Sequence, residues 1–137
     1  LKSKLEVAFS KQSNVCIVGY TSEMSQWMAV SDVLVTKPGG ITITEALTRN
    51  IPMVLYNPAP GQEKENALLF ESKDLARIAH NKEELLMIID SLISNLFFRK
   101  RMVRKLKEYQ KPNATETIVK HVVNTMEIES SVMRIKS

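Results

Sequence analysis

The sequence predicts an α/β fold in which a parallel sheet is covered by helices on both faces. The first observation is that the hydrophobic period switches repeatedly along residues 1–79 between 2, typical of strands, and 3.6, typical of helices. The second is that the predicted strands at residues 32–36, 52–56 and 75–79 are mainly apolar and do not alternate between apolar and polar residues. Such strands are buried on both faces, as in parallel sheets between helices. We therefore expect a Rossmann-like, doubly wound half.

The elements follow one another in a regular order. A helix at residues 1–9 precedes a short strand at residues 15–18, and a second helix follows in which Met24, Trp27 and Met28 recur at helical spacing. The strand at 32–36 ends before a proline, because proline has no amide hydrogen to donate to a ladder. The next elements are a helix at 41–48, a strand at 52–56, a helix that runs from the proline-rich loop 57–61 to residue 72, and a strand at 75–79.

The chain from residue 82 onward is predicted to be helical. A basic segment forms the second helix of this part, and a third is expected at residues 115–128. We assign residues 1–128 to one domain and residues 129–137 to a frayed tail. The first predicted helix after residue 82 has an apolar stripe made of Leu85, Leu86, Ile89, Leu92 and Ile93.

The composition is that of one globular domain. A length of 137 residues, with 44% apolar and 25% charged residues, allows a sizeable core. The apolar runs are far shorter than the roughly 20 residues of a membrane-spanning helix. The single cysteine, Cys16, excludes a disulfide framework and is expected in the core, and no metal site and no cofactor are predicted. Because the chain begins at Leu1 within a predicted helix, we expect it to be part of a longer protein.

Basic side chains are concentrated in residues 95–111, which hold seven lysine and arginine residues and one acidic residue, Glu108. With Phe97, Phe98 and Tyr109, this pattern has three explanations: a solvated helix face, a contact with an anionic surface, or nucleic-acid binding. No recognised nucleic-acid module surrounds the segment. We therefore favour the solvated face and expect no nucleic-acid partner.

Two loops carry the candidate chemistry, because ligands of open α/β sheets bind beyond the carboxyl ends of the strands. The first loop leads through Gly39 and Gly40 to a helix start, where free amide groups and the helix dipole favour an anion such as a diphosphate. Thr42 and Thr44 add hydroxyl groups, and Glu45 is placed to accept hydrogen bonds from two neighbouring sugar hydroxyls. The alternative is that Thr42-x-x-Glu45 is a capping box that only starts the helix.

The second loop, residues 57–66, places Gln62 and Glu63 at the start of another helix. Amide and carboxylate groups recognise sugar hydroxyls, since both accept hydrogen bonds and the amide also donates them. The alternative is a solvated first turn, which favours glutamate by itself. Other motifs are absent: no Gly-x-Gly-x-x-Gly follows a strand, no P-loop is complete, and His80 and His121 lack the partners of a triad or a metal site.

Taken together, TKPGGITITEA (residues 36–46) and NPAPGQEKENA (residues 57–67) resemble the paired signature of family 28 glycosyltransferases. The resemblance is to the glycolipid branch, which contains processive diacylglycerol glucosyltransferases and monogalactosyldiacylglycerol synthases. It covers residues 1–120 and is strongest over residues 15–70. It implies the carboxyl-terminal half of a GT-B fold, which holds the UDP-sugar.

The implied enzyme is inverting and metal-independent, and it transfers a hexose, expected to be glucose, from a UDP-sugar to diacylglycerol or glycosyl-diacylglycerol. UDP-galactose and UDP-N-acetylglucosamine are alternative donors. A non-catalytic nucleotide-sugar sensor or interaction module is the alternative outside the enzyme class. The resemblance further implies a cytoplasmic protein that lies peripherally on the inner face of the cell membrane, with Phe97, Phe98 and the basic helix as a hypothetical contact.

The resemblance also implies which residues bind the UDP-sugar. The diphosphate would lie against Gly39, Gly40, Ile41 and Thr42, and the ribose hydroxyls would bind Glu45. The uracil would lie beside Tyr20, Thr21 and Met24. The hexose would contact Gln62 and Glu63, and Asn66 would support that turn.

Some parts of the implied enzyme are missing from the sequence. The family's first strand of this domain would precede Leu1, and so would the amino-terminal domain, which binds the acceptor lipid and provides the catalytic base. No catalytic residue is therefore assigned in this chain, which alone should be inactive. Asp74 stands where relatives often have glycine, so the turn before Leu75 can differ from theirs.

Overall fold

The core of the structure is a parallel sheet. The computed structural model describes residues 1–110, in which three strands pair in the order β1 (Leu34–Thr36), β2 (Met53–Tyr56) and β3 (Ala76–Ala79). The register pairs Leu34 with Met53 and Tyr56 with Ala79. Residues 53–55 of β2 are fully buried, because this central strand is covered on both faces. The predicted parallel sheet and the strands at 32–36, 52–56 and 75–79 are confirmed, with slightly shorter bounds.

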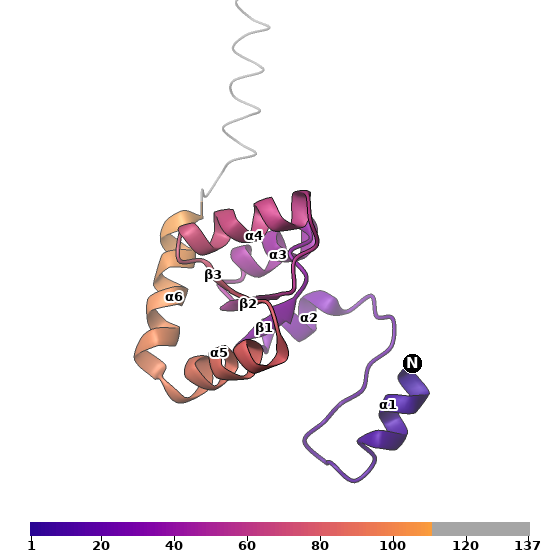
Figure 1. Ribbon diagram of the computed structural model, residues 1–137. Coiled ribbons are helices and arrows are strands. Elements are labelled where there is room, and N and C mark those ends of the chain that lie inside the picture. The colour runs from indigo at the N-terminus through magenta and orange to yellow at the C-terminus, as the bar shows by residue number, and fades with distance from the viewer. Residues whose placement is uncertain (111–137) are drawn as a thin grey trace, which may run out of the picture. The chain divides into compact units, whose positions relative to one another are not determined.

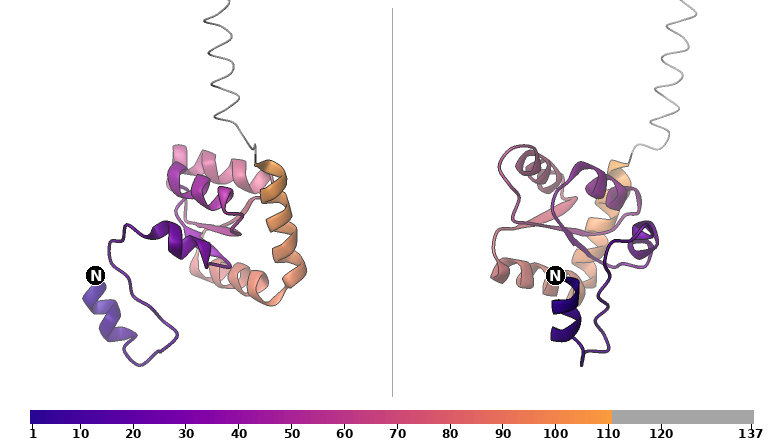
Figure 2. Two further views of the ribbon diagram at one scale, coloured as in Figure 1. Left: turned by 180° about the vertical axis from the view of Figure 1, so that it is seen from behind. Right: turned by 90° about the vertical axis from the view of Figure 1, so that its right-hand side faces the viewer.

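Helices cover both faces of the sheet (Figure 1). α3 (Gly40–Thr48) connects β1 to β2, and α4 (Gln62–Ser72) connects β2 to β3. These two crossovers run in the same direction between neighbouring parallel strands, so both helices lie on one face, and α5 (Lys82–Ser94) lies on the other (Figure 2). Met102 and Leu106 of α6 (Leu96–Tyr109) join the core. The Rossmann-like arrangement is therefore confirmed.

The apolar stripe of α5 differs from the predicted one. Leu92 is buried, and Leu85, Ile88 and Ile89 pack against the core, whereas Leu86 and Ile93 are 57% and 61% exposed. The observed stripe has the spacing i, i+3, i+4 and i+7, which places all four side chains on one face of a helix. The prediction was wrong at Leu86 and Ile93 because these residues lie about 100° around the helix from the two neighbours that face the sheet.

Two helices end in the same left-handed turn. After α4, Asp74 has a φ of 59°, the Asp74 amide donates to Glu71 O at 3.0 Å, and the Leu75 amide donates to Phe70 O at 2.9 Å. This is the Schellman arrangement, in which glycine is the usual left-handed residue. Asp74 therefore adopts the backbone conformation that glycine would have, and its carboxylate also pairs with two arginines, Arg77 and Arg101. The other such turn follows α3, with Asn50 at a φ of 58°.

The amino-terminal segment departs from the prediction. α1 (Lys2–Ala8) forms, but none of its residues is buried. Residues 15–18 are not a strand, and Cys16 is exposed instead of lying in the core. No strand pairs with this segment within residues 1–110, and an isolated strand leaves its backbone hydrogen bonds unmade. α2 (Met24–Ala29) follows, and only Met28 of its predicted apolar residues is buried.

Some predictions concern residues beyond the described part. The helix expected at 115–128, His121 and the tail at 129–137 lie outside residues 1–110. Residues Leu1–Lys107 form one compact unit. Within the described residues, no helix combines the length and the apolar character needed to cross a bilayer.

Candidate functional site

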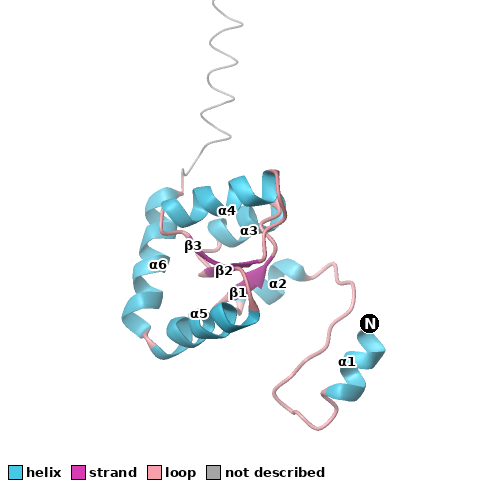
Figure 3. Cartoon of the chain, in the orientation of Figure 1, coloured by secondary structure: helices cyan, strands magenta, loops and turns pink. Residues whose placement is uncertain are grey.

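The two candidate loops lie at the same edge of the sheet. Because β1 and β2 are parallel, the loop from Lys37 to Gly39 and the loop from Asn57 to Gly61 both leave the sheet at its carboxyl edge (Figure 3). This is the edge at which open α/β sheets bind ligands. The structure therefore places the loops together, as their positions after neighbouring strands predicted.

The start of α3 is open to a ligand. Gly39 is the residue before the helix, in extended conformation, and no side chain caps the first turn. A Cβ added at Gly39 or Gly40 would meet no atom within 4 Å, and neither glycine has a positive φ. The packing of the chain itself therefore does not require glycine here. Ile41, in this first turn, is 80% exposed.

The capping-box alternative for this loop is wrong. α3 begins at Gly40, so Thr42 lies inside the first turn and cannot be the residue that caps it. The Thr44 hydroxyl donates to Gly40 O at 2.7 Å, within the helix. Glu45 is exposed, and its carboxylate makes no hydrogen bond or ion pair with another residue in the part of the chain that the structure describes.

The second loop closes on itself before α4. Gly61 has a φ of 92°, a conformation that side chains disfavour, and it leads into Gln62, the exposed first residue of the helix. Glu63 is half-buried, and its Oε2 accepts a hydrogen bond from the Ala59 amide at 2.9 Å. One carboxylate oxygen of Glu63 therefore holds the loop, so this side chain is more than part of a solvated first turn.

Side chains connect the two loops in both directions. Lys37 Nζ donates a hydrogen bond to the Asn57 carbonyl, so a side chain of the first loop holds the backbone of the second. Asn66 Nδ2, from the second turn of α4, donates to the carbonyl of buried Pro38 at 3.1 Å. Asn66 therefore does more than support its own turn, because it holds the opposite loop.

The three residues implied for uracil lie on the segment that leads into α2. Tyr20 is fully exposed, Met24 is 48% exposed, and half-buried Thr21 accepts a hydrogen bond from the Glu23 amide at 2.9 Å. Within residues 1–110 no hydrogen bond joins these three residues to the two loops. Hydrogen bonds therefore connect the two loops that carry eight of the implied residues, and none connects these loops to the three residues implied for uracil within the described part of the chain.

Comparison with known proteins decides the family. Residues 1–125 match the glycosyltransferase family 28 C-terminal domain. The chain belongs to this family. It is 42% identical over 135 residues to a processive diacylglycerol beta-glucosyltransferase of Staphylococcus haemolyticus (strain JCSC1435). The aligned residues make up 98% of this chain and 34% of that protein.

A second relative gives the same picture. The chain is 44% identical over 124 residues to a processive diacylglycerol beta-glucosyltransferase of Staphylococcus aureus (strain Newman). The aligned residues make up 90% of this chain and 32% of that protein. The family 28 domain therefore spans about a third of the length of the curated relatives it matches. The resemblance to family 28 that the two motifs indicated is confirmed.

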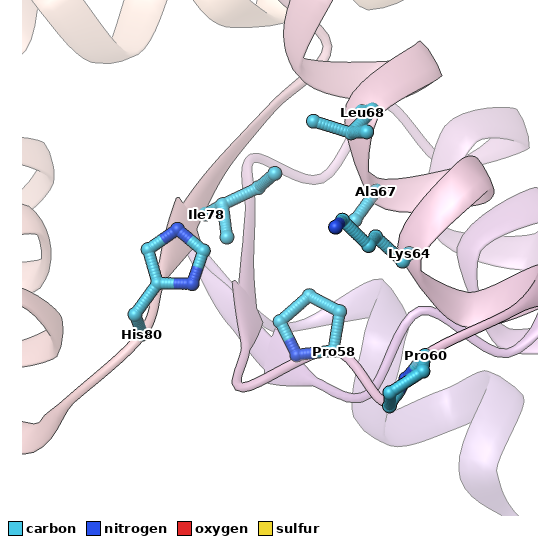
Figure 4. A pocket seen from close by; sticks show the side chains of 7 residues that line it. All are labelled: Pro58, Pro60, Lys64, Ala67, Leu68, Ile78 and His80. Carbon is cyan, nitrogen blue, oxygen red and sulfur yellow. The ribbon is translucent and has the colours of Figure 1, made fainter.

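A pocket of about 270 Å³ opens beside the second loop of the family 28 domain (Figure 4). Its walls are mostly apolar, and Lys64 and His80 are the ionisable groups among them. None of the residues implied for the UDP-sugar lines it, although Pro58 and Pro60 belong to the second loop. The lining residues are Pro58, Pro60, Lys64, Ala67, Leu68, Ile78 and His80.

The structure adds two residues that the sequence analysis did not single out. Lys37 and Asn57 connect the loops, and both belong to the motifs that carry the family resemblance. A lysine before Pro-Gly-Gly can contact solvent, a ligand or another loop, so the motif alone does not predict which of these Lys37 contacts. The left-handed φ of 44° at Asn57 is a further sign of a constrained position, since asparagine tolerates this conformation better than most residues.

Proposed function

We propose that this family 28 domain binds a UDP-sugar and that the enzyme containing it transfers glucose to diacylglycerol or glycosyl-diacylglycerol. The observation that carries the proposal is the pairing of an uncapped, glycine-lined helix start with a second loop that side chains hold against it. The activity of the relatives that are 42% and 44% identical to this chain supports glucose as the transferred hexose and diacylglycerol as the acceptor.

The start of α3 would bind the diphosphate. The first amide groups of a helix have no partner inside the helix, and the dipole favours negative charge at this end. Gly39 and Gly40 leave space for the phosphates, while Ile41 and Thr42 contribute the amide groups. Glu45 would accept hydrogen bonds from the ribose hydroxyls, since its carboxylate is exposed on the same helix.

The second loop would bind the hexose. Gln62 is exposed. Glu63 Oε2 accepts a hydrogen bond from the Ala59 amide, so Oε1 would be the oxygen that accepts from the sugar. An amide that donates and a carboxylate that accepts match the alternating hydroxyls of a hexose. Tyr20, Thr21 and Met24 would lie beside the uracil.

The contribution of this domain to catalysis would be leaving-group stabilisation. When the sugar leaves, negative charge develops on the diphosphate, and the amide groups at the start of α3 stabilise that charge without a metal ion. The catalytic base and the acceptor site belong to another part of the enzyme. This chain then provides donor binding and electrostatic stabilisation.

The enzyme would act peripherally on the cytoplasmic face of the membrane, where its lipid acceptor lies. Phe98 does not fit the expected membrane contact, because it packs against the core and the Arg77 guanidinium lies 5.4 Å from its ring centroid. Phe97 fits better, since it is 79% exposed. Arg99 lies 4.0 Å from Asp32, and Arg101 pairs with Asp74 at 3.1 Å, so these arginines also have partners within the domain.

Titration of the whole enzyme with UDP tests the donor site. We expect Glu45→Ala to weaken UDP binding at least about tenfold, because hydrogen bonds to a charged group contribute about 1.5–3 kcal/mol. Calorimetry measures the dissociation constant. Glu83→Ala is the matched control, since Glu83 is an exposed glutamate near the start of a different helix, α5. The absence of measurable UDP binding by the wild-type enzyme would contradict the proposal.

Transfer assays separate the remaining alternatives. Glucose transfer to diacylglycerol by the wild-type enzyme excludes a non-catalytic sensor. Comparison of UDP-glucose, UDP-galactose and UDP-N-acetylglucosamine then identifies the donor, with the highest kcat/KM expected for UDP-glucose. A higher kcat/KM for either of the other two sugars would replace glucose in the proposal.

A further inference from the structure

The connection between the loops continues the sheet beyond its last backbone pair. β1 and β2 pair up to Thr36 and Leu55, and the two loops follow at Lys37 and Asn57. Lys37 then donates to the Asn57 carbonyl, and Asn66 donates to the Pro38 carbonyl. Beyond the last backbone pair of β1 and β2, two side-chain hydrogen bonds thus connect the chain segments.

The two acceptors are themselves fixed in place. Pro38 is buried and has no amide hydrogen, so its carbonyl is its only hydrogen-bonding group. The Asn57 amide donates to Ala79 O at 2.7 Å, which ties this residue to the end of β3. Lys37 and Asn66 therefore each hold a backbone segment that is anchored on its other side. A change in either side chain should alter the separation of the loops more than the fold.

We propose that Lys37 and Asn66 are positioning residues that set the distance between the diphosphate-binding and the hexose-binding parts of the donor site. The proposal rests on the proposed function, in which the first loop meets the diphosphate and the second meets the hexose. UDP contacts only the first part, whereas a UDP-sugar spans both. Loss of the bridge should therefore weaken binding of the UDP-sugar selectively, because small displacements of a binding group cost much of its contribution.

Binding of two ligands to the whole enzyme tests this. We expect Lys37→Met and Asn66→Ala each to raise the ratio of the UDP-glucose Kd to the UDP Kd about tenfold, while the UDP Kd stays within about twofold. Lys37→Arg keeps a cationic donor and should restore the ratio. Lys73→Met is the matched control, because Lys73 is exposed at the far end of α4 and should leave both constants unchanged. Calorimetry measures each constant, and the unfolding midpoint verifies that each variant is folded.

The outcomes distinguish the bridge from other roles of Lys37. Equal weakening of UDP and UDP-glucose by Lys37→Met would mean that the lysine contacts the diphosphate directly, and it would overturn the proposal. Unchanged binding of both ligands in both variants would overturn it as well. The double variant should lose less than the product of the single losses, because both side chains act on the same separation.

A measurement without ligand separates this inference from the proposed function. In the unliganded enzyme, amide hydrogen exchange at residues 39–42 and 57–63 should be faster in Lys37→Met and Asn66→Ala than in the wild type. Unchanged exchange would overturn the bridge whatever the ligand is. A wild-type enzyme that binds neither UDP nor UDP-glucose, but shows this faster exchange in the variants, would contradict only the donor site.

Discussion

At the scale of single residues, Asp74 has a backbone role and a charge role. Its left-handed φ ends α4, and its carboxylate accepts hydrogen bonds from Arg77 at 2.9 Å and Arg101 at 3.1 Å. The hydrogen bond from Arg77 is the main cause that lowers the pKa of this carboxyl below its ordinary value; partial burial opposes it and Arg101 adds to it. The comparison with glycine-bearing relatives concerned only the backbone, so it could not predict the ion pairs, whose arginines lie three and 27 residues away.

The charge role predicts a pH-dependent stability. Asp74→Asn keeps a side chain that tolerates the left-handed conformation and removes the negative charge. Because the folded pKa is lowered, the charge stabilises the fold above the unfolded pKa of about 4, and this effect is lost as the pH falls through the folded pKa. We expect Asp74→Asn to lower the free energy of unfolding by up to about 1 kcal/mol at pH 7 and by less at pH 3. Urea unfolding at the two pH values measures the difference.

Asp90→Asn is the control for this prediction. Asp90 is exposed on α5, and its carboxylate makes no hydrogen bond or ion pair with another of residues 1–110. Its replacement should not show the same pH dependence. If Asp74→Asn lost as much stability at pH 3 as at pH 7, the ion pairs would not be the cause.

At the scale of elements, two helices share a capping pattern that only one of them uses. Asn81-x-x-Glu84 starts α5: Asn81 Oδ1 accepts from the Glu84 amide at 2.9 Å, and the Glu84 carboxylate accepts from the His80 amide at 2.8 Å. Thr42-x-x-Glu45 has the same spacing, but α3 begins at Gly40, directly after Pro38-Gly39. The spacing predicts that a cap is possible, and the residues before it decide where the helix begins.

This difference predicts that two substitutions lower the free energy of unfolding by different amounts. Asn81→Ala removes the cap of α5 and should lower the free energy of unfolding by about 1 kcal/mol. Thr42→Ala removes no cap and should lower the free energy of unfolding by less than about 0.5 kcal/mol. It should weaken UDP binding by the whole enzyme, because it removes a hydroxyl group that can donate to the diphosphate. Urea unfolding and UDP titration of the two variants measure these effects. A larger loss of stability in Thr42→Ala than in Asn81→Ala would contradict the observed start of α3.

Which elements the sequence predicted depends on how local their causes are. β2 and the starts of α3 and α4 follow from apolar runs, prolines and glycines next to them in the chain, so these were predicted closely. Residues 15–18 have the composition of a strand, but a strand also needs a partner, and composition does not contain that information. The bridge joins Lys37 to Asn57, 20 residues apart in sequence, so the site motifs were predictable and the contact between them was not.

At the scale of the whole molecule, α6 presents an exposed face with mixed apolar and basic character. Leu96 and Phe97 are 50% and 79% exposed, and Lys100 and Lys107 are exposed at positions that helical spacing places on the same side. The net charge of +4 agrees in sign with an anionic partner. A face of this kind attracts anionic lipid headgroups through its lysines, and its apolar side chains can enter the interface. Met102 and Leu106 bury the opposite side of the helix in the core.

This face leads to a prediction about the proposed binding of the whole enzyme to membranes. We expect Lys100→Glu/Lys107→Glu to weaken binding to vesicles that contain anionic lipids at least about tenfold, because each basic residue near such a surface contributes about 1 kcal/mol. The binding should fall with increasing salt, since the Debye length shortens from about 10 Å at 0.1 M to 3 Å at 1 M. Vesicle sedimentation measures it, with Lys73→Glu as the control for a charge reversal elsewhere on the surface. Unchanged sedimentation of the double variant would show that the enzyme meets the membrane through another surface, and α6 would then be a solvated helix, as its charge pattern alone allows.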